Sequence, residues 1–150
     1  MELDAQWIVG FTDGEGCFHV GVAKHPEMKM GVQVLPELTI VQHKRDVHVL
    51  HAIKRFFCCG AVRTNHGDRM CFRVRKLRNI LDHVIPFFDQ HPLKTRKRQD
   101  FLAFRDVVLA MSRGEHLTDA GLQRITRIAK GMNTGREDGG GEGKVKSSPS

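Results

Sequence analysis

Two acids end an apolar stretch near the N-terminus, residues 7–18, which reads WIVGFTDGEGCF. Asp13 and Glu15 stand beside Gly14 and Gly16, where the apolar run stops. Acids at the C-terminal end of a helix oppose its macrodipole, so helix stability does not explain them. The chain as a whole is basic, with 24 Lys and Arg against 17 Asp and Glu and a net charge of +7, and residues 133–150 add nothing to this excess. An acid in this position within a basic protein predicts a divalent metal ion that acts on a phosphate.

Hydrolysis of a phosphodiester needs an activated water, a metal ion at the leaving oxygen and positive charge near the phosphate. Glu15 offers a carboxylate and Gly14 a carbonyl, which are the oxygen ligands that hard cations prefer. Lys97 or a neighbouring base could polarise the phosphate or the water, and Gln42 could orient a water. One Glu is too little for a two-metal site, but two copies that pair through the small residues Gly10 and Gly14 would bring two Glu15 together.

The elements that must position these residues follow from periodicity and breakers. Alternating apolar residues and hairpin signals predict strands at 17–24, 31–42, 61–66 and 69–75, with Pro36 marking a bulge or an edge. Helical spacing predicts helices at 5–13, 45–57, 77–85, 94–112 and 118–131. Asp4 and Thr118 are the expected N-caps of the first and last helices, and Pro86 is expected to close the third.

Two hairpins separated by a helix predict an α+β fold of order αββαββα, with one four-stranded antiparallel sheet and helices on one face. The other face should be open and rich in groups that read base edges in the major groove, where a β-ribbon fits. A plain solvated sheet face remains the alternative. The predicted open-face residues are His19, Gln33, Glu37, Thr39, Arg63, Asn65, Arg73 and Arg75, with Ala23, Leu35 and Cys71 as apolar members. Lys24, Lys94 and Arg96 complete the candidate DNA-binding set. The last two belong to the basic run KTRKR at 94–98, which is expected to bind an external phosphate, with an ordinary solvated turn as the alternative.

Length and composition limit the other possibilities. A chain of 150 residues fits one domain, expected at 1–132, with a disordered Gly/Ser-rich tail at 133–150. There is no run of eighteen apolar residues for a membrane span and no CxxC pair among the four cysteines for a zinc site. The N-terminal MELDAQW lacks the features of a signal or transit peptide, so we expect either that the protein works where it is made or that a targeting segment lies outside this sequence.

Three blocks in order resemble one known family. WIVGFTDGEGCF is similar to the signature of the LAGLIDADG homing endonucleases, IPFFDQHPLKTRKRQDFLAF at 85–104 resembles the family's catalytic-lysine region, and GEHLTDAGLQRITRIAKGMN at 114–133 resembles its C-terminal helical segment. The resemblance covers about residues 5–133. A single signature resembles the homodimeric branch, whose target is near-palindromic.

The resemblance implies a four-stranded saddle in the DNA major groove and a metal-dependent, intron-encoded endonuclease with a long site. Glu15 then matches the metal-binding acid, Gly14 the carbonyl donor and Gln42 a polar group near the active-site water. The catalytic lysine falls among Lys94, Arg96 and Lys97, with the choice between them open. The implied dimer interface consists of Trp7, Gly10, Phe11, Asp13 and Gly14, although Asp13 could instead support the end of its helix.

The implied cofactor is Mg2+, with Mn2+ or Ca2+ as other occupants, and the implied partners are double-stranded DNA and a second copy of the chain. Proteins on this scaffold also act as intron RNA maturases or as DNA-binding proteins that do not cut, so these stay as alternatives. The implied location is an organelle (chloroplast or mitochondrion) or the bacterial cytoplasm.

Overall fold

A computed structural model describes residues 1–140, with side chains up to Met132. The strands are β1 (Gly16–Lys24), β2 (Val32–His43), β3 (Ala61–His66) and β4 (Arg69–Val74). The helices are α1 (Ala5–Glu15), α2 (Val47–Phe57), α3 (Leu77–Asn79), α4 (Ile85–Gln90), α5 (Lys97–Ser112) and α6 (Asp119–Gly140). A π-helical turn at Ile80–Val84 joins α3 to α4.

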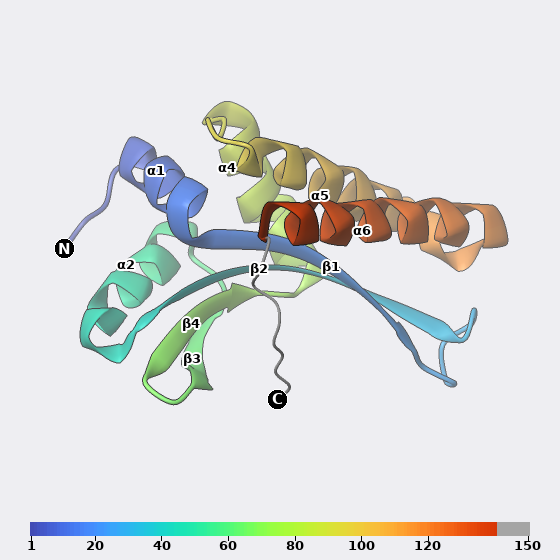
Figure 1. Ribbon diagram of the computed structural model, residues 1–150, viewed down its shortest axis with the longest axis horizontal. Coiled ribbons are helices and arrows are strands. Elements are labelled where there is room, and N and C mark those ends of the chain that lie inside the picture. The colour runs from blue at the N-terminus through green and yellow to red at the C-terminus, as the bar shows by residue number, and fades with distance from the viewer. Residues whose placement is uncertain (141–150) are drawn as a thin grey trace.

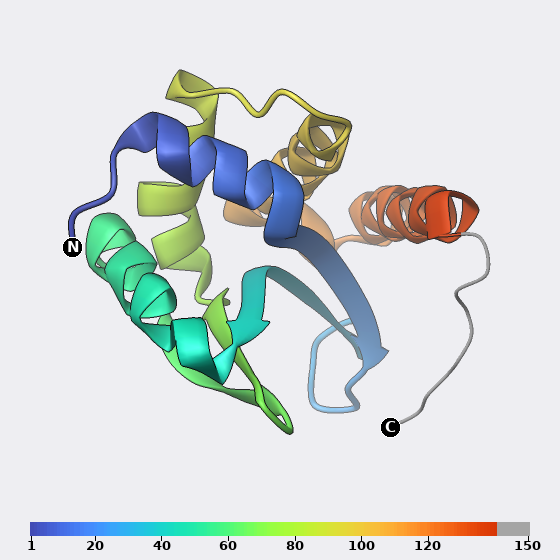
Figure 2. The same ribbon diagram turned by 60° about the vertical axis from the view of Figure 1, so that its left-hand side comes forward.

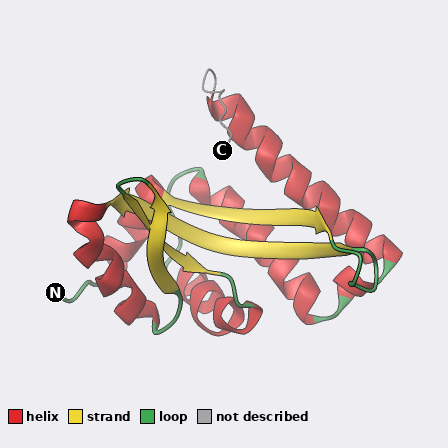
Figure 3. Cartoon of the chain, turned by 90° about the horizontal axis from the view of Figure 1, so that it is seen from below, coloured by secondary structure: helices red, strands yellow, loops and turns green. Residues whose placement is uncertain are grey.

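The four strands form one antiparallel sheet in the order β1-β2-β4-β3. The sheet arches beneath the helices (Figure 1), and the view from below shows its strands uncovered in front of them (Figure 3). The predicted α+β fold with a saddle-shaped sheet and helices on one face is confirmed.

Aromatic side chains fill the space between the sheet and its helices. Phe18 of β1 is fully buried, and its ring lies 5.6 Å from Phe88 of α4 and 5.4 and 5.2 Å from Phe101 and Phe104 of α5. These edge-on and tilted contacts are the geometries that aromatic pairs prefer. They attach β1 and α5 to one another, and these are the two elements that flank the end of α1.

The first helix begins and ends at specific capping contacts. The Asp4 carboxylate accepts a hydrogen bond of 2.8 Å from the backbone N–H of Trp7, which caps the helix as predicted. At the other end the N–H of Gly16 donates to the Thr12 carbonyl, and β1 begins at once. A Cβ at Gly16 would lie 2.7 Å from Cγ2 and 2.9 Å from the carbonyl oxygen of Thr12, so this position requires glycine. Glu15 therefore sits at a tight junction between helix and strand, two residues beyond the predicted helix end.

Of two prolines, Pro36 fits one of its two expected roles and Pro86 does not fit its expected role. Pro36 pairs with Val20 in an unbroken register, so it marks no bulge, but β4 pairs with β2 only from Leu38 onward, so Pro36 lies where β2 is an edge. Pro86 does not close its helix, which continues to Gln90. Because a π-helical turn precedes it, the chain accommodates a proline that lacks a backbone donor.

The last helix is longer than predicted. Thr118 caps α6 as expected, since its hydroxyl accepts a hydrogen bond of 3.1 Å from the N–H of Gly121, but the backbone stays helical to Gly140. Residues 141–150, the rest of the predicted tail, lie outside the described residues. Within residues 1–140 no helix combines the length and apolar character that a bilayer crossing requires. The four cysteines are free thiols, as expected.

The Thr12 side chain offers a test of how α1 packs. Its hydroxyl is buried and has no hydrogen-bond partner among the described residues. Because an unpaired buried hydroxyl costs about 1–3 kcal/mol, Thr12→Val should raise the free energy of unfolding by about 1 kcal/mol and the melting temperature by about 2–4 °C. Thermal unfolding at fixed protein concentration measures the change. Thr126→Val on the half-exposed surface of α6 is the control and should change little; an unchanged or lower stability for Thr12→Val would contradict the packing described.

Candidate active site

Three residues far apart in the sequence meet at the C-terminal end of α1. The exposed Glu15 carboxylate accepts a hydrogen bond of 3.0 Å from the amide of Gln42, near the end of β2. The Lys97 ammonium, from the first turn of α5, donates to the backbone carbonyl of Gly16, the residue after Glu15. The structure thus brings together an acid, an amide and a base that the sequence had suggested separately.

Lys97 is the member of the basic run whose side chain reaches this point. Lys94 and Arg96 lie in the loop that precedes α5, and both are exposed. Figure 2 shows this loop running alongside α1 on its way from α4 to α5. Of the three positions that the sequence left open, the geometry therefore favours Lys97 as the base beside Glu15.

Asp13 makes its hydrogen bonds within its own chain. Its carboxylate accepts hydrogen bonds from the backbone N–H groups of Lys94 (2.9 Å) and Thr95 (3.2 Å) and from the Thr95 hydroxyl (2.8 Å). The side chain is therefore directed to the loop before α5 within the same chain, which favours a role at the helix end over the role in a dimer interface. Asp13 also places a negative charge near the N-terminus of α5, where the basic run opposes the helix dipole.

Thr95 is a functional candidate that the sequence analysis missed. Its hydroxyl donates to Asp13 and accepts a hydrogen bond of 3.2 Å from the N–H of Lys97. A threonine two residues before the first residue of a helix is a recognisable capping signal.

The end of α1 offers some, but not all, of the oxygen ligands that a divalent cation needs. Glu15 is an exposed carboxylate, and the last carbonyls of a helix, Gly14 among them, lack intrahelical donors and lie at the negative end of the dipole. Among the side chains that the structure describes, up to Met132, there is no group of three or more His, Cys, Asp and Glu that could hold a metal ion. The residues present fit a hard divalent cation only if further oxygen ligands come from outside the chain.

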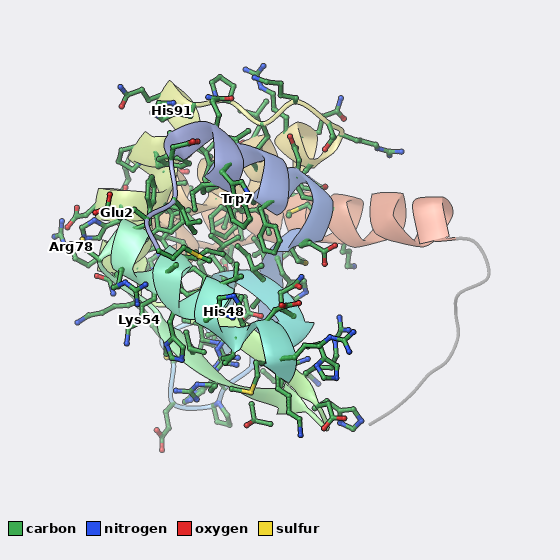
Figure 4. All side chains as sticks on the ribbon, turned by 90° about the vertical axis from the view of Figure 1, so that its left-hand side faces the viewer. Glu2, Trp7, His48, Lys54, Arg78 and His91 are labelled. Carbon is green, nitrogen blue, oxygen red and sulfur yellow. The ribbon has the colours of Figure 1, made fainter. Side chains whose placement is uncertain are left out.

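The outward face of α1 is apolar and flat. Ile8, Val9 and Thr12 are buried beneath the helix, while Gly10 and Gly14 are exposed and have open space within 4 Å of where a Cβ would stand. Trp7, labelled in Figure 4, is 40% exposed and stacks on Phe11 with ring centroids 4.6 Å apart. The predicted interface residues Trp7, Gly10, Phe11 and Gly14 do share one face.

The predicted base-reading residues share the uncovered side of the sheet, because directly paired residues of antiparallel strands point the same way. The pairs are His19 with Glu37, Ala23 with Gln33, Leu35 with Gly21, Thr39 with Arg73, and Arg63 with Cys71. Asn65 lies at a break in the β3–β4 register. Lys24 pairs with Val32 on the alternate side of β1 and so does not share this face.

Two features reduce the number of groups on the uncovered sheet face that are free to contact DNA. Arg75 donates to the Glu37 carboxylate at 2.7 Å, so the acid on this face is neutralised and the guanidinium is oriented. Cys71 is buried and not available as an apolar contact. Its burial raises the pKa of the thiol, an effect that Arg73 opposes.

Solved structures of known proteins match the fold of this chain. I-TnaI, solved as a homing endonuclease, is 55% identical, and the match covers 92% of this chain and 93% of that one with a TM-score of 0.86. I-SmaMI, solved bound to an uncleaved DNA target in the presence of calcium ions, is 30% identical over 87% of this chain and 45% of its own, with a TM-score of 0.84.

A curated relative is the "Probable intron-encoded endonuclease 2" of Neurospora crassa, 30% identical over 127 residues, which are 84% of this chain and 26% of that protein. The chain spans about a quarter of the length of such curated fungal relatives. Residues 8–108 match the family model described as LAGLIDADG endonuclease. The chain belongs to the LAGLIDADG endonuclease family.

Proposed function

We propose that this chain is a homodimeric, metal-dependent endonuclease that cuts double-stranded DNA at a long, near-palindromic site. The observation that carries the proposal is the convergence of Glu15, Gln42 and Lys97 at the end of α1, beside an open and basic sheet face. Relatives described as intron-encoded or homing endonucleases support the activity, and I-SmaMI on its DNA target supports the substrate.

DNA binding is assigned to the uncovered side of the sheet. Its arch suits a rounded duplex, and its arginine, amide and hydroxyl groups are the types that hydrogen-bond to base edges and phosphates. One chain presents four strands and can follow only half of a long site. Two chains related by a two-fold axis would read the same bases on each side, which is why the target should be near-palindromic.

Dimer formation is assigned to the outward face of α1. Because Gly10 and Gly14 carry no side chains, two such helices could approach until their backbones touch, with Trp7 and Phe11 packed at the edge. This approach would place two Glu15 carboxylates near the two-fold axis.

The protein residues then have separate tasks in hydrolysis. Glu15 and the carbonyl of Gly14 would hold the divalent cation, with further ligands from the partner chain, water and the scissile phosphate. When bound, Mg2+ would polarise the phosphate and stabilise the leaving oxygen. Gln42 donates to the Glu15 carboxylate and would orient the attacking water, and Lys97 would supply positive charge where negative charge accumulates.

A binding selection followed by a cleavage assay tests the proposal and identifies the target at the same time. Duplexes that bind the protein are selected from a randomised library in Ca2+, the ion present with uncleaved DNA in the I-SmaMI structure. The recovered duplex is then incubated with Mg2+, Mn2+ or EDTA. We expect breaks in both strands with Mg2+ and none with EDTA.

The same assay separates the alternatives. Tight binding without cleavage in Mg2+ and Mn2+ would identify a DNA-binding protein that does not cut. Tighter binding to structured intron RNA than to the selected duplex would favour the maturase alternative. Either result would overturn the proposed activity.

A further inference from the structure

A chain of hydrogen bonds that leads from α1 to α5 starts at Asp13. Both oxygens of its carboxylate are used: Oδ2 accepts from the N–H of Lys94, and Oδ1 accepts from the N–H and the hydroxyl of Thr95. A carboxylate that accepts three hydrogen bonds holds its donors more firmly than a neutral acceptor would. One side chain of α1 thus fixes two consecutive residues of a loop that is distant in the sequence.

Thr95 passes this constraint on to α5. Its hydroxyl gives its one proton to Asp13 and accepts from the N–H of Lys97 at 3.2 Å, while its carbonyl accepts from the N–H of Arg98 at 3.0 Å. These contacts set where the first turn of α5 begins. The Lys97 side chain leaves from that turn and reaches the carbonyl of Gly16.

The loop before α5 has few other anchors. Leu93 is buried in the core, whereas Lys94, Thr95 and Arg96 are exposed and have no regular secondary structure. Lysine side chains are long and flexible, and the run contains four bases in five residues. Charge and side-chain length alone therefore do not select which base lies at the end of α1. The Asp13–Thr95 contact can select it, because Thr95 also bonds the N–H of Lys97.

We propose that Asp13 is a positioning residue, which through Thr95 sets the first turn of α5 and holds Lys97 beside Glu15. The two acids of the signature then have distinct roles: Glu15 would bind the metal ion at the substrate, and Asp13 positions Lys97. The catalytic part of this inference rests on the proposed function, whereas the placement of the Lys97 side chain does not.

Thr95 provides matched variants. Thr95→Val keeps the shape of the side chain but removes the hydroxyl, and Thr95→Ser keeps the hydroxyl. The core of α5, with Phe101, Phe104 and Val107 buried, should hold the fold in both. We expect the single-turnover cleavage rate at saturating DNA to fall by about 100-fold in Thr95→Val and in Asp13→Ala, with DNA affinity little changed. Thr95→Ser should restore most of the rate.

A double-mutant cycle distinguishes positioning from general destabilisation. In a Lys97→Met background the base is already gone, so adding Thr95→Val should slow cleavage no further. An additive loss in this background would overturn the inference, because it would show that Thr95 acts independently of Lys97.

A second measurement does not need activity. In an NMR spectrum of lysine NH3+ groups, the Lys97 signal is assigned by its loss in Lys97→Arg. We expect this signal to be protected from exchange in the parent and in Thr95→Ser, and to be lost in Thr95→Val and Asp13→Ala. A Lys97 signal that is unchanged in Thr95→Val would refute the inference even if the protein cuts DNA, and a protected signal in a protein that does not cut would leave the placement standing while the proposed function fails.

Discussion

Glu15→Gln is expected to slow DNA cleavage by about 1,000-fold, which corresponds to about 4 kcal/mol of lost transition-state stabilisation. The substitution keeps the size of the side chain and its ability to accept the hydrogen bond from Gln42, but it removes the charge that would hold a divalent cation. Since Glu15 is exposed and not part of the core, folding and DNA affinity should change little. Cleavage of the selected duplex under single-turnover conditions measures the effect.

Glu2→Gln is the matched control for Glu15. Glu2 is exposed, is labelled in Figure 4, and precedes α1, so its replacement removes the same charge without touching the site. This variant should cleave like the parent. Cleavage by Glu15→Gln at the parental rate would mean that the metal is held elsewhere.

Gly10→Leu is expected to convert the proposed dimer to a monomer and to abolish double-strand cleavage. A leucine side chain would stand on the face of α1 that is now flat and would separate two packed helices by several ångströms. Because nothing lies within 4 Å of a Cβ at Gly10, the isolated chain should tolerate the substitution. Light scattering gives the mass, and the nuclease assay gives the activity.

Gly131→Leu tests whether the effect is specific to α1. Gly131 lies in α6, is exposed, and likewise has open space where a Cβ would stand. Its replacement introduces the same apolar side chain on a helix surface and should leave both mass and cleavage unchanged. If Gly10→Leu kept the parental mass, the outward face of α1 would not be the interface.

For the two signature acids, the sequence predicts that their side chains point in different directions but not what each one contacts. Helical geometry alone places Asp13 and Glu15 about 200° apart around α1, so they had to face different surroundings. What Asp13 faces could not be predicted, because its donors in Lys94 and Thr95 belong to an irregular loop whose path depends on the core. The gathering of Glu15 and Gln42 depends likewise on how α1 packs on the sheet.

Within the basic run, the sequence could not show which side chain reaches the end of α1. Lys94, Arg96 and Lys97 have similar charge and reach, so composition could not separate them; only the start of α5 at Lys97 does. By contrast, the outward face of α1 and the polar face of the sheet follow directly from the periods of helix and strand. Pro86 was misjudged because a π-helical turn, which leaves no mark in apolar spacing, removed its conflict with the helix.

Two chains are proposed to complete one active site, each contributing a Glu15. The most direct test is a mixed dimer, in which the parent and Glu15→Gln carry different affinity tags and only doubly tagged particles are assayed, with each DNA strand labelled separately. We predict that this dimer binds the selected duplex like the parent but fails to make the double-strand break. Cleavage of both strands at the parental rate, matching a mixed dimer of parent and Glu2→Gln, would contradict the claim.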